Sequence, residues 1–249
     1  MIEGKKIYFA SDFHLGSPSH EESLVREKKL VRWLDSIKNQ AEEIYLVGDL
    51  FDFWFEYKTV IPKGYVRILG KLAELRDSGI PIHFFVGNHD LWMFGYFEKE
   101  LGIPVHFDPI VKQLGNKIFM IGHGDGIGPK DYGYKFIKKI FTNPFCQWLF
   151  HRLHPNFGIW LAKIWSRQSR LSNNDNEFLG EDDEWQIVYA KERLKKEKID
   201  YFIFGHRHLT IEHPLENGTR FINLGDWITN FSYAEFDGEN LQLKFYEKD

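Results

Sequence analysis

The sequence predicts an α/β fold in which two β-sheets and their flanking helices form a four-layer α/β/β/α sandwich that carries one helical insertion. Three observations predict it. Short apolar runs rich in β-branched and aromatic residues recur along the chain, most of them end in a polar turn, and helical spacing of apolar residues separates the first three. With 249 residues, 43% of them hydrophobic, the chain is also long enough to bury a full core.

The predicted elements alternate for most of the chain and become antiparallel at its end. Strands are expected at Lys6–Ala10, Ile44–Val47, Ile82–Val86, Ile118–Ile121, Tyr201–Phe204 and Phe221–Leu224. Apolar residues at helical spacing predict helices across residues 24–37 and 66–75. A β-hairpin is expected to close the fold, because the Asp237-Gly238 turn separates two further strand-like runs, Ser232–Phe236 and Leu241–Tyr246.

Residues 128–198 interrupt this rhythm and are expected to form a helical cap on a core made of residues 1–127 and 199–249. From Lys130 to Arg170 the segment has eight Lys or Arg residues and one acidic residue, a net charge of +7, whereas the whole chain has −4. Such a basic block indicates an anionic partner. Most of the many aromatic residues of the segment are expected to form a small core of their own; the alternative is that they contact a ligand with an apolar part.

Composition excludes several classes of protein. A single cysteine, Cys146, excludes an internal disulfide framework and fits a reducing compartment. Because we find neither a secretory signal nor an apolar stretch near the ~18 residues of a transmembrane helix, we expect a cytoplasmic protein. The negative net charge, with the basic residues confined to one aromatic-rich segment, argues against nucleic acid as a partner. No obligate protein partner is evident.

Each of the first five predicted strands leads directly into a short polar motif. The motifs are Asp12-Phe13-His14, Gly48-Asp49, Gly87-Asn88-His89, Gly122-His123 and Gly205-His206-Arg207-His208. Groups that follow the carboxyl ends of strands in an open α/β sheet converge on one crevice. An extended backbone at Asp12–His14 and His206–His208 would place alternate side chains on one face. Each motif alone is common in turns, but five of them in order predict a site.

The residue types in these motifs predict a metal centre. Imidazole, carboxylate and amide oxygen together suit Mn²⁺, Fe or Zn²⁺, and the lack of thiolates argues against a structural zinc site. Two metal ions about 3.5–4 Å apart need a shared ligand, and the carboxylate of Asp49 is the candidate for that bridge. The expected ligands of the two divalent ions are Asp12, His14, Asp49, Asn88, His123, His206 and His208.

The five motifs, which span residues 12 to 208, resemble those of the calcineurin-like metallophosphoesterase superfamily. The resemblance implies that Asp12, His14, Asp49 and His208 bind one metal, and that Asp49, Asn88, His123 and His206 bind the other. It implies that a metal-activated hydroxide attacks phosphorus while His89 acts beside the scissile phosphate as an acid or charge stabiliser. Asp49 and His89 are therefore the expected catalytic residues. Asp52 either contacts and orients the metal ligands without binding a metal itself, or caps the N-terminus of a helix.

A closer resemblance extends over nearly the whole chain. Three segments resemble those of UDP-2,3-diacylglucosamine hydrolases, the pyrophosphatases of lipid A synthesis: His123-Gly-Asp-Gly-Ile-Gly-Pro-Lys-Asp131-Tyr-Gly-Tyr134, the aromatic run that leads to Ser166-Arg-Gln-Ser169-Arg170, and Gly48-Asp-Leu-Phe-Asp-Phe-Trp54. The resemblance implies hydrolysis of UDP-2,3-diacylglucosamine to UMP and 2,3-diacylglucosamine 1-phosphate, with Mn²⁺ as the metal. It also implies substrate contacts from Asp131, Tyr134, Arg167, Ser169 and Arg170.

Two residues depart from that family's pattern. His89 stands where many members have arginine, and Arg207 stands where a small residue is frequent. An alternative function is a broader phosphodiesterase or nucleotide pyrophosphatase that acts on soluble substrates. If the substrate bears acyl chains, it resides in a bilayer. Because Lys and Arg with Trp and Phe suit a membrane interface, we expect peripheral association with the anionic surface of the inner membrane.

Overall fold

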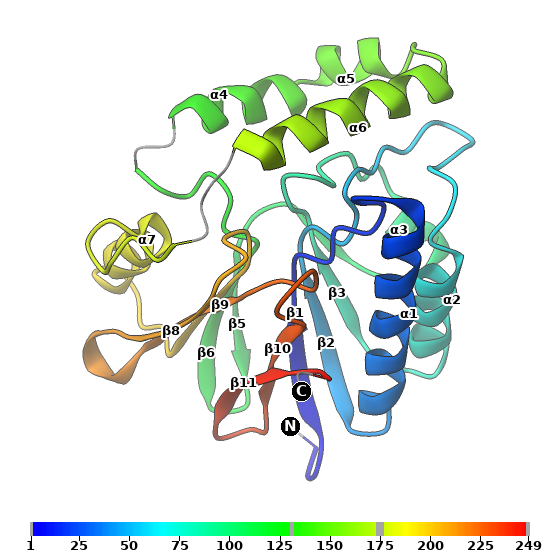
Figure 1. The fold of residues 1–249 in the computed structure, drawn as a ribbon. Coiled ribbons are helices and arrows are strands. Elements are labelled where there is room, and N and C mark those ends of the chain that lie inside the picture. Colours follow the sequence, from blue (N-terminus) through cyan, green and yellow to red (C-terminus); the bar gives the residue numbers. More distant parts are fainter. Residues whose placement is uncertain (1, 130–131, 173–176, 248–249) are drawn as a thin grey trace.

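Two β-sheets pack face to face in the computed structural model, which describes residues 2–129, 132–172 and 177–247, without the side chains of residues 167–172 (Figure 1). The first sheet has the strand order β11 (Leu241–Phe245), β10 (Ser232–Phe236), β1 (Lys6–Ala10), β2 (Ala41–Val47), β3 (Ile82–Phe85) and β4 (Val105–His106). The second has the order β5 (Ile110–Leu114), β6 (Lys117–Ile121), β7 (Tyr201–Phe204), β9 (Arg220–Leu224) and β8 (Thr210–Pro214). Strands β1 to β4 are parallel to one another, as are β6, β7 and β9.

Helices complete the four layers on both outer faces. Helices α1 (His20–Ile37), α2 (Val66–Asp77) and α3 (Tyr96–Glu100) cover the first sheet, and α7 (Trp185–Leu194) covers the second (Figure 1). Helix α1 begins where the hydroxyl of Ser19 accepts a hydrogen bond from Glu22 N, and it buries Trp33 and Leu34 against the sheet. The predicted α/β/β/α architecture is therefore confirmed.

The predicted strands and helices are present, with shifts of a few residues at their ends. The elements that the sequence did not predict are short: β4, β5, β8 and helix α3 have two to five residues each. Strands β5 and β8 pair antiparallel with their neighbours at the two edges of the second sheet. Apart from the buried Leu114 and Ile211, their residues are exposed or half-buried, so these strands lack the apolar runs that mark central strands.

A layer of three helices lies above the strand ends: α4 (Tyr132–Phe141), α5 (Pro144–Phe150) and α6 (Pro155–Ser172) (Figure 1). We call residues 132–172 the cap. The indole Nε1 of Trp92 donates to Phe141 O at 2.7 Å, and the Phe150 ring lies 4.8 Å from that of Trp92, so the cap packs on the core. Helix α7, within the expected insertion 128–198, buries Ile187 and Ala190 against the second sheet instead.

The cap does not enclose its own aromatic residues. Phe136, Phe145, Trp148, Trp160 and Trp165 are all at least 50% exposed, and no residue of α4 or α5 is buried. The expectation that these rings form a small core within the cap is therefore wrong. The reason is geometric, because a single layer of helices has an inner face that packs on the core and an outer face without a partner.

A polar cluster joins the two sheets near the end of β3. His83 stacks on Tyr45 with 4.8 Å between ring centroids, and its Nδ1 lies 3.1 Å from His106 Nε2. From the second sheet, Lys112 Nζ donates to Glu43 Oε2 at 2.9 Å and lies 3.4 Å from His83 Nε2. Burial, together with the charge of Lys112, lowers the pKa of His83 to about 4.

The His83 cluster predicts a loss of stability in mild acid. Because the pKa of His83 is lower in the folded chain than its ordinary value, the unfolded chain binds the proton more tightly, and stability falls as the pH drops from about 6.5 to 4. Between pH 7 and 4.5, His83→Gln should lose about 2 kcal/mol less unfolding free energy than the wild type. Urea unfolding at both pH values measures this, and equal losses in the two proteins would contradict it.

Candidate metal centre

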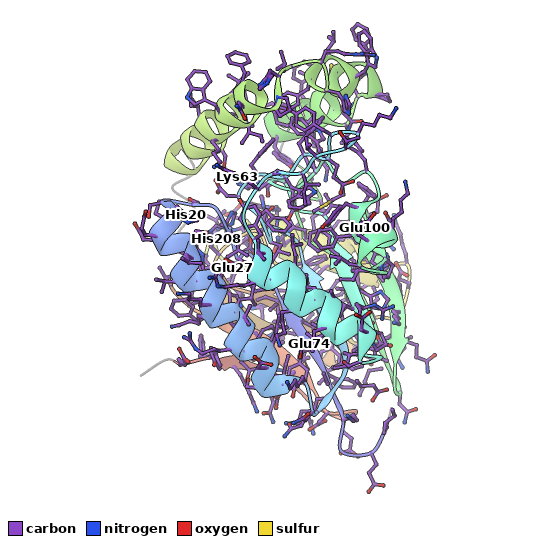
Figure 2. All side chains as sticks on the ribbon, turned by 90° about the vertical axis from the view of Figure 1, so that its right-hand side faces the viewer. His20, Glu27, Lys63, Glu74, Glu100 and His208 are labelled. Atoms are coloured by element: carbon purple, nitrogen blue, oxygen red, sulfur yellow. The ribbon has the colours of Figure 1, made fainter. Side chains whose placement is uncertain are left out.

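Five loops meet where the strands end, and they bring together all seven of the expected ligands. The loops after β1, β2 and β3 leave the first sheet, and those after β6 and β7 leave the second. The crevice is therefore bordered by both sheets and not by one open sheet. Figure 2 shows His208 near the N-terminal end of α1, on the side of the sandwich that faces the cap.

One group of donor atoms surrounds His14. Its Nε2 lies 2.9 Å from His208 Nε2, 3.8 Å from Asp12 Oδ1 and 3.6 Å from Asp49 Oδ2. His208 Nε2 in turn lies 3.3 Å from Asp12 Oδ1. Asp12, His14 and His208 thus offer donor atoms that all lie within 4.8 Å of one another.

A second group surrounds Asn88 and shares one residue with the first. Asn88 Oδ1 lies 2.8 Å from His206 Nδ1 and 3.1 Å from His123 Nε2. His123 Nε2 also lies 3.4 Å from Asp49 Oδ2, the same oxygen that faces His14. Asp49, which is 1% exposed, therefore stands between the two groups, where a shared ligand is required.

The backbone at the candidate ligands is strained, and the extended conformation expected at Asp12–His14 and His206–His208 is wrong. Five of these residues have a left-handed φ: Asp12 (57°), His14 (43°), Asp49 (52°), His206 (72°) and His208 (53°). Residues other than glycine rarely adopt this conformation, so the surrounding structure must impose it. The amides of Phe13 and His14 both donate to Asp49 O, and the amide of Trp227 donates to Asp12 O. These bonds hold the tight turns that aim the side chains inward.

Two glycines give the carboxylates room beside the main chain. A Cβ atom on Gly87 would lie 2.1 Å from Asp49 Oδ1, and one on Gly205 would lie 2.4 Å from Asp12 Oδ2. Because no side chain is present, Asp49 Oδ1 accepts from His89 N and Asp12 Oδ2 accepts from His206 N, each at 2.9 Å. Each carboxylate thus uses one oxygen for the backbone and directs the other into the site.

The buried charges set the protonation of the site. Although burial alone would raise the pKa of Asp12 and Asp49, the imidazoles around them lower both pKa values below the ordinary range. Burial would also lower the pKa of His123, but Asp49 outweighs it and raises that pKa to about 10. Burial and the charge of His123 lower the pKa of His206 to about 4. The carboxylates are therefore ionised, and they attract cations.

These donor atoms fit divalent cations. Asp12 Oδ1 is buried and has no hydrogen-bond partner among the residues that the structure describes, a costly state for a carboxylate oxygen. The Nε2 atoms of His14 and His208 face each other at 2.9 Å, which suits two nitrogen lone pairs that share a bound cation. Oxygen and imidazole donors without thiolates suit Mn²⁺, Fe or Zn²⁺.

His89 lies beside the first group and contacts the cap. Its ring is perpendicular to that of His14, with 4.8 Å between centroids. Its Nδ1 lies 3.1 Å from Asp52 O and 3.0 Å from the hydroxyl of Ser166, which belongs to α6. The Asp52 carboxylate lies 3.7 Å from His14 Nδ1, and no helix begins after it. Of its two expected roles, Asp52 therefore has the supporting one.

The expected substrate contacts are only partly described. Tyr134 lies beside the site, where its hydroxyl donates to Asp125 Oδ2 at 2.5 Å and its ring lies 6.2 Å from that of His206. Lys138 also pairs with Asp125, at 2.5 Å. Asp131 lies outside the described residues, as do the side chains of three residues of α6: Arg167, Ser169 and Arg170.

Arg207 points away from the metal ligands that flank it. Its guanidinium forms two hydrogen bonds with the Glu184 carboxylate, at 3.0 and 3.2 Å, and lies 4.4 Å from the Trp185 ring centroid. Arg207 is 3% exposed and Glu184 is 0% exposed. Arg207, which departs from the family pattern, therefore links the loop after β7 to the start of helix α7.

Sequence reasoning missed several residues that support the loops. Gln186 Nε2 donates to Gly124 O and Gly205 O, at 3.3 and 3.0 Å, and Asn223 Nδ2 donates to Gly205 O at 2.6 Å. Both side chains are fully buried. Asn223 could have been found from the sequence, because it is a polar residue inside the otherwise apolar strand β9. Ser166 stood in a segment that resembles the hydrolase family, but nothing in that segment indicated its contact with the core.

Comparisons with known proteins agree with this geometry. Residues 5–209 match the family described as calcineurin-like phosphoesterase. The chain is 41% identical to a UDP-2,3-diacylglucosamine hydrolase of Porphyromonas gingivalis, over 97% of this chain and 98% of that protein. It is 30% identical to a protein of the same name from Aeromonas salmonicida, over 88% and 85% of the two chains, and 28% identical to one from Edwardsiella ictaluri, over 94% and 90%.

The Arg207–Glu184 pair predicts a specific pattern of stability. Glu184→Ala should lower the free energy of unfolding by about 3–5 kcal/mol, because it removes the carboxylate that forms two hydrogen bonds with the buried Arg207 guanidinium. Replacing both residues, as Glu184→Leu with Arg207→Met, removes both charges and should restore most of that loss. Urea unfolding measures both variants. A loss below about 1 kcal/mol in Glu184→Ala would contradict the role assigned to the pair.

Proposed function

The chain belongs to the calcineurin-like phosphoesterase family, and we propose that it hydrolyses the pyrophosphate bond of UDP-2,3-diacylglucosamine to UMP and 2,3-diacylglucosamine 1-phosphate. The observation that carries this proposal is the 41% identity to a UDP-2,3-diacylglucosamine hydrolase over 97% of this chain and 98% of the relative. That span includes the cap, the part of the molecule best suited to distinguish one phosphoester from another. The complete set of seven candidate ligands supports a working hydrolase.

We assign the metals according to the two groups of donor atoms. Asp12, His14, Asp49 and His208 would hold one divalent ion, and Asp49, Asn88, His123 and His206 the other. Mn²⁺ is the proposed metal. When bound, the ions supply Lewis acidity, which neutralises charge on the phosphoryl oxygens and makes the attacking water more acidic.

The residues of the chain position the metal ligands and set which nitrogen of His89 carries a proton. The strained turns aim the ligands inward and are held by main-chain hydrogen bonds, so little reorganisation is needed at the moment of reaction. The proposed role of His89 is to assist the leaving oxygen. A carbonyl oxygen only accepts, so the contact with Asp52 O places a proton on Nδ1. His89 Nε2 has no hydrogen bond to the described residues. In the imidazolium form, which carries a proton on both ring nitrogens, Nε2 could donate its proton to the leaving oxygen while Nδ1–H keeps its contact with Asp52 O.

The cap suits a substrate that is both anionic and lipidic. Exposed rings on α5 and α6, such as Trp148 and Trp160, lie among basic side chains, and the Arg152 guanidinium stacks on Trp148 at 4.7 Å. Tyr134 reaches the edge of the metal site from α4. We propose that residues 128–198 are an insertion in the core, and that Asp131, Tyr134, Arg167, Ser169 and Arg170 contact the sugar and phosphates. A soluble substrate would not require the exposed aromatic face.

Activity on the proposed substrate is the direct test. Purified protein with Mn²⁺ should release UMP from UDP-2,3-diacylglucosamine much faster than it cleaves a bis-aryl phosphodiester. Asp49→Ala should lower both rates by at least about 10³-fold, because the ligand shared by both ions is lost. Metal analysis should show about two ions per wild-type chain and fewer than one per Asp49→Ala chain.

The alternative outcomes are distinct. Turnover of the aryl diester without turnover of the lipid substrate would keep the metal chemistry and reject the lipid assignment. It would favour the broader phosphodiesterase or nucleotide pyrophosphatase that acts on soluble substrates. An Asp49→Ala variant with wild-type metal content would contradict the proposed bridging role.

We also propose that the cap docks on the anionic inner surface of the membrane where the substrate resides. None of the described helices combines the length and apolarity that crossing a bilayer requires. Association would instead use the outer face of the cap, where aromatic and basic side chains are exposed together. Lys139, Arg152 and Lys163 are exposed there, whereas Lys138 is paired with Asp125.

Liposome co-sedimentation tests the membrane proposal. Replacing Lys139, Arg152 and Lys163 with Gln should weaken binding to anionic vesicles by roughly tenfold or more, since each charge contributes about 1 kcal/mol near such a surface. Binding of the wild type should also fall as salt is added. The matched control replaces Lys28, Lys196 and Lys198, which are exposed outside the cap, and should bind like the wild type. Equal binding by the two triple variants would reject the cap as the docking face.

A further inference from the structure

One side chain of the cap enters the catalytic centre of the core. Ser166 is 6% exposed, although it belongs to a helix whose neighbouring residues Ile164 and Trp165 are 47% and 56% exposed. Its hydroxyl lies 3.1 Å from Asp52 Oδ2, 3.1 Å from Asp52 O and 3.0 Å from His89 Nδ1. A cap that only bound substrate would not need this contact.

The directions of these hydrogen bonds follow from their chemistry. The carboxylate and the carbonyl oxygen of Asp52 only accept, so the Ser166 hydroxyl is the donor to both Asp52 Oδ2 and Asp52 O. Because Asp52 O is a carbonyl oxygen, His89 carries its proton on Nδ1, and the Ser166 oxygen can accept from that same N–H. The result is a chain from His89 Nδ1–H through the Ser166 hydroxyl to Asp52.

We propose that Ser166 is a positioning residue that orients His89 from the cap, so that hydrolysis depends on the seating of α6. The inference rests on the proposed role of His89 beside the leaving oxygen. The Asp52 carboxylate also faces a metal ligand, because its Oδ1 lies 3.7 Å from His14 Nδ1 as well as 3.9 Å from His89 Nδ1. Without the Ser166 hydroxyl, the carboxylate loses a partner and the His89 ring loses one of its two Nδ1 contacts.

The kinetic test uses two soluble diesters that have no acyl chains. These are the phenyl and 4-nitrophenyl esters of uridine 5′-monophosphate, assayed with Mn²⁺. Ser166→Ala should lower kcat about tenfold on the phenyl ester and only two- to threefold on the 4-nitrophenyl ester, because the better leaving group needs less assistance. KM should stay nearly constant. Asn156→Ala, at an exposed position nearer the N-terminus of α6, is the matched control and should retain wild-type rates.

A double-mutant cycle separates positioning from a general effect on folding. In a His89→Ala background, Ser166→Ala should change kcat on the phenyl ester less than twofold, since the residue that it orients is absent. An undiminished tenfold loss in that background would overturn the inference and leave the proposed function intact. A wild-type rate for His89→Ala would overturn both the inference and the role proposed for His89.

A second measurement requires no turnover. Nitrogen-15 chemical shifts of the His89 ring should indicate a single tautomer, protonated on Nδ1, in the metal-free wild type. In Ser166→Ala the two ring-nitrogen shifts should move toward each other as the tautomers mix. Unchanged shifts in Ser166→Ala, together with unchanged melting temperature, would show that Asp52 O alone fixes the ring and would overturn the inference.

Discussion

The Asp49 carboxylate is nearly inaccessible to solvent, and the rest of the site is arranged around it. One oxygen accepts from the amide of His89, and the other faces imidazoles from both sheets. A buried carboxylate in this setting must be matched by positive charge, which the described residues around it supply as the imidazoles of His123, His89 and His14. The need to neutralise Asp49 therefore explains why loops from two separate sheets approach so closely.

That approach requires backbone conformations that isolated segments would avoid. Left-handed turns at Asp12, Asp49 and His206 persist because the strands before them are buried and because main-chain bonds link one loop to the next. Gln186 and Asn223 add side-chain bonds to the same loops. The sandwich thus holds its strained groups in place by packing that lies outside the site itself.

The sequence predicted the central strands, the layers and the convergence of the polar motifs because those depend on local patterns: apolar runs, helical spacing and the position of polar residues after strands. It did not predict the conformation of Asp12–His14, since a left-handed turn has no signature in residues that also occur in extended chains. It also did not predict the partners of Glu184 and Ser166. Those contacts join segments that are far apart in the chain, and only the tertiary fold brings them together.

The contact between Ser166 and His89 has a consequence for how such chains diverge. Two residues separated by 77 positions share one small space, one on the core and one on the cap. A larger or charged group at position 89 would need a different neighbour at position 166, so the two positions should covary among relatives. A chimaera that joins the cap of one relative to the core of another would then lose activity unless this pair is exchanged together. Compatibility of cap and core, and not the metal ligands alone, would limit which recombinants remain active.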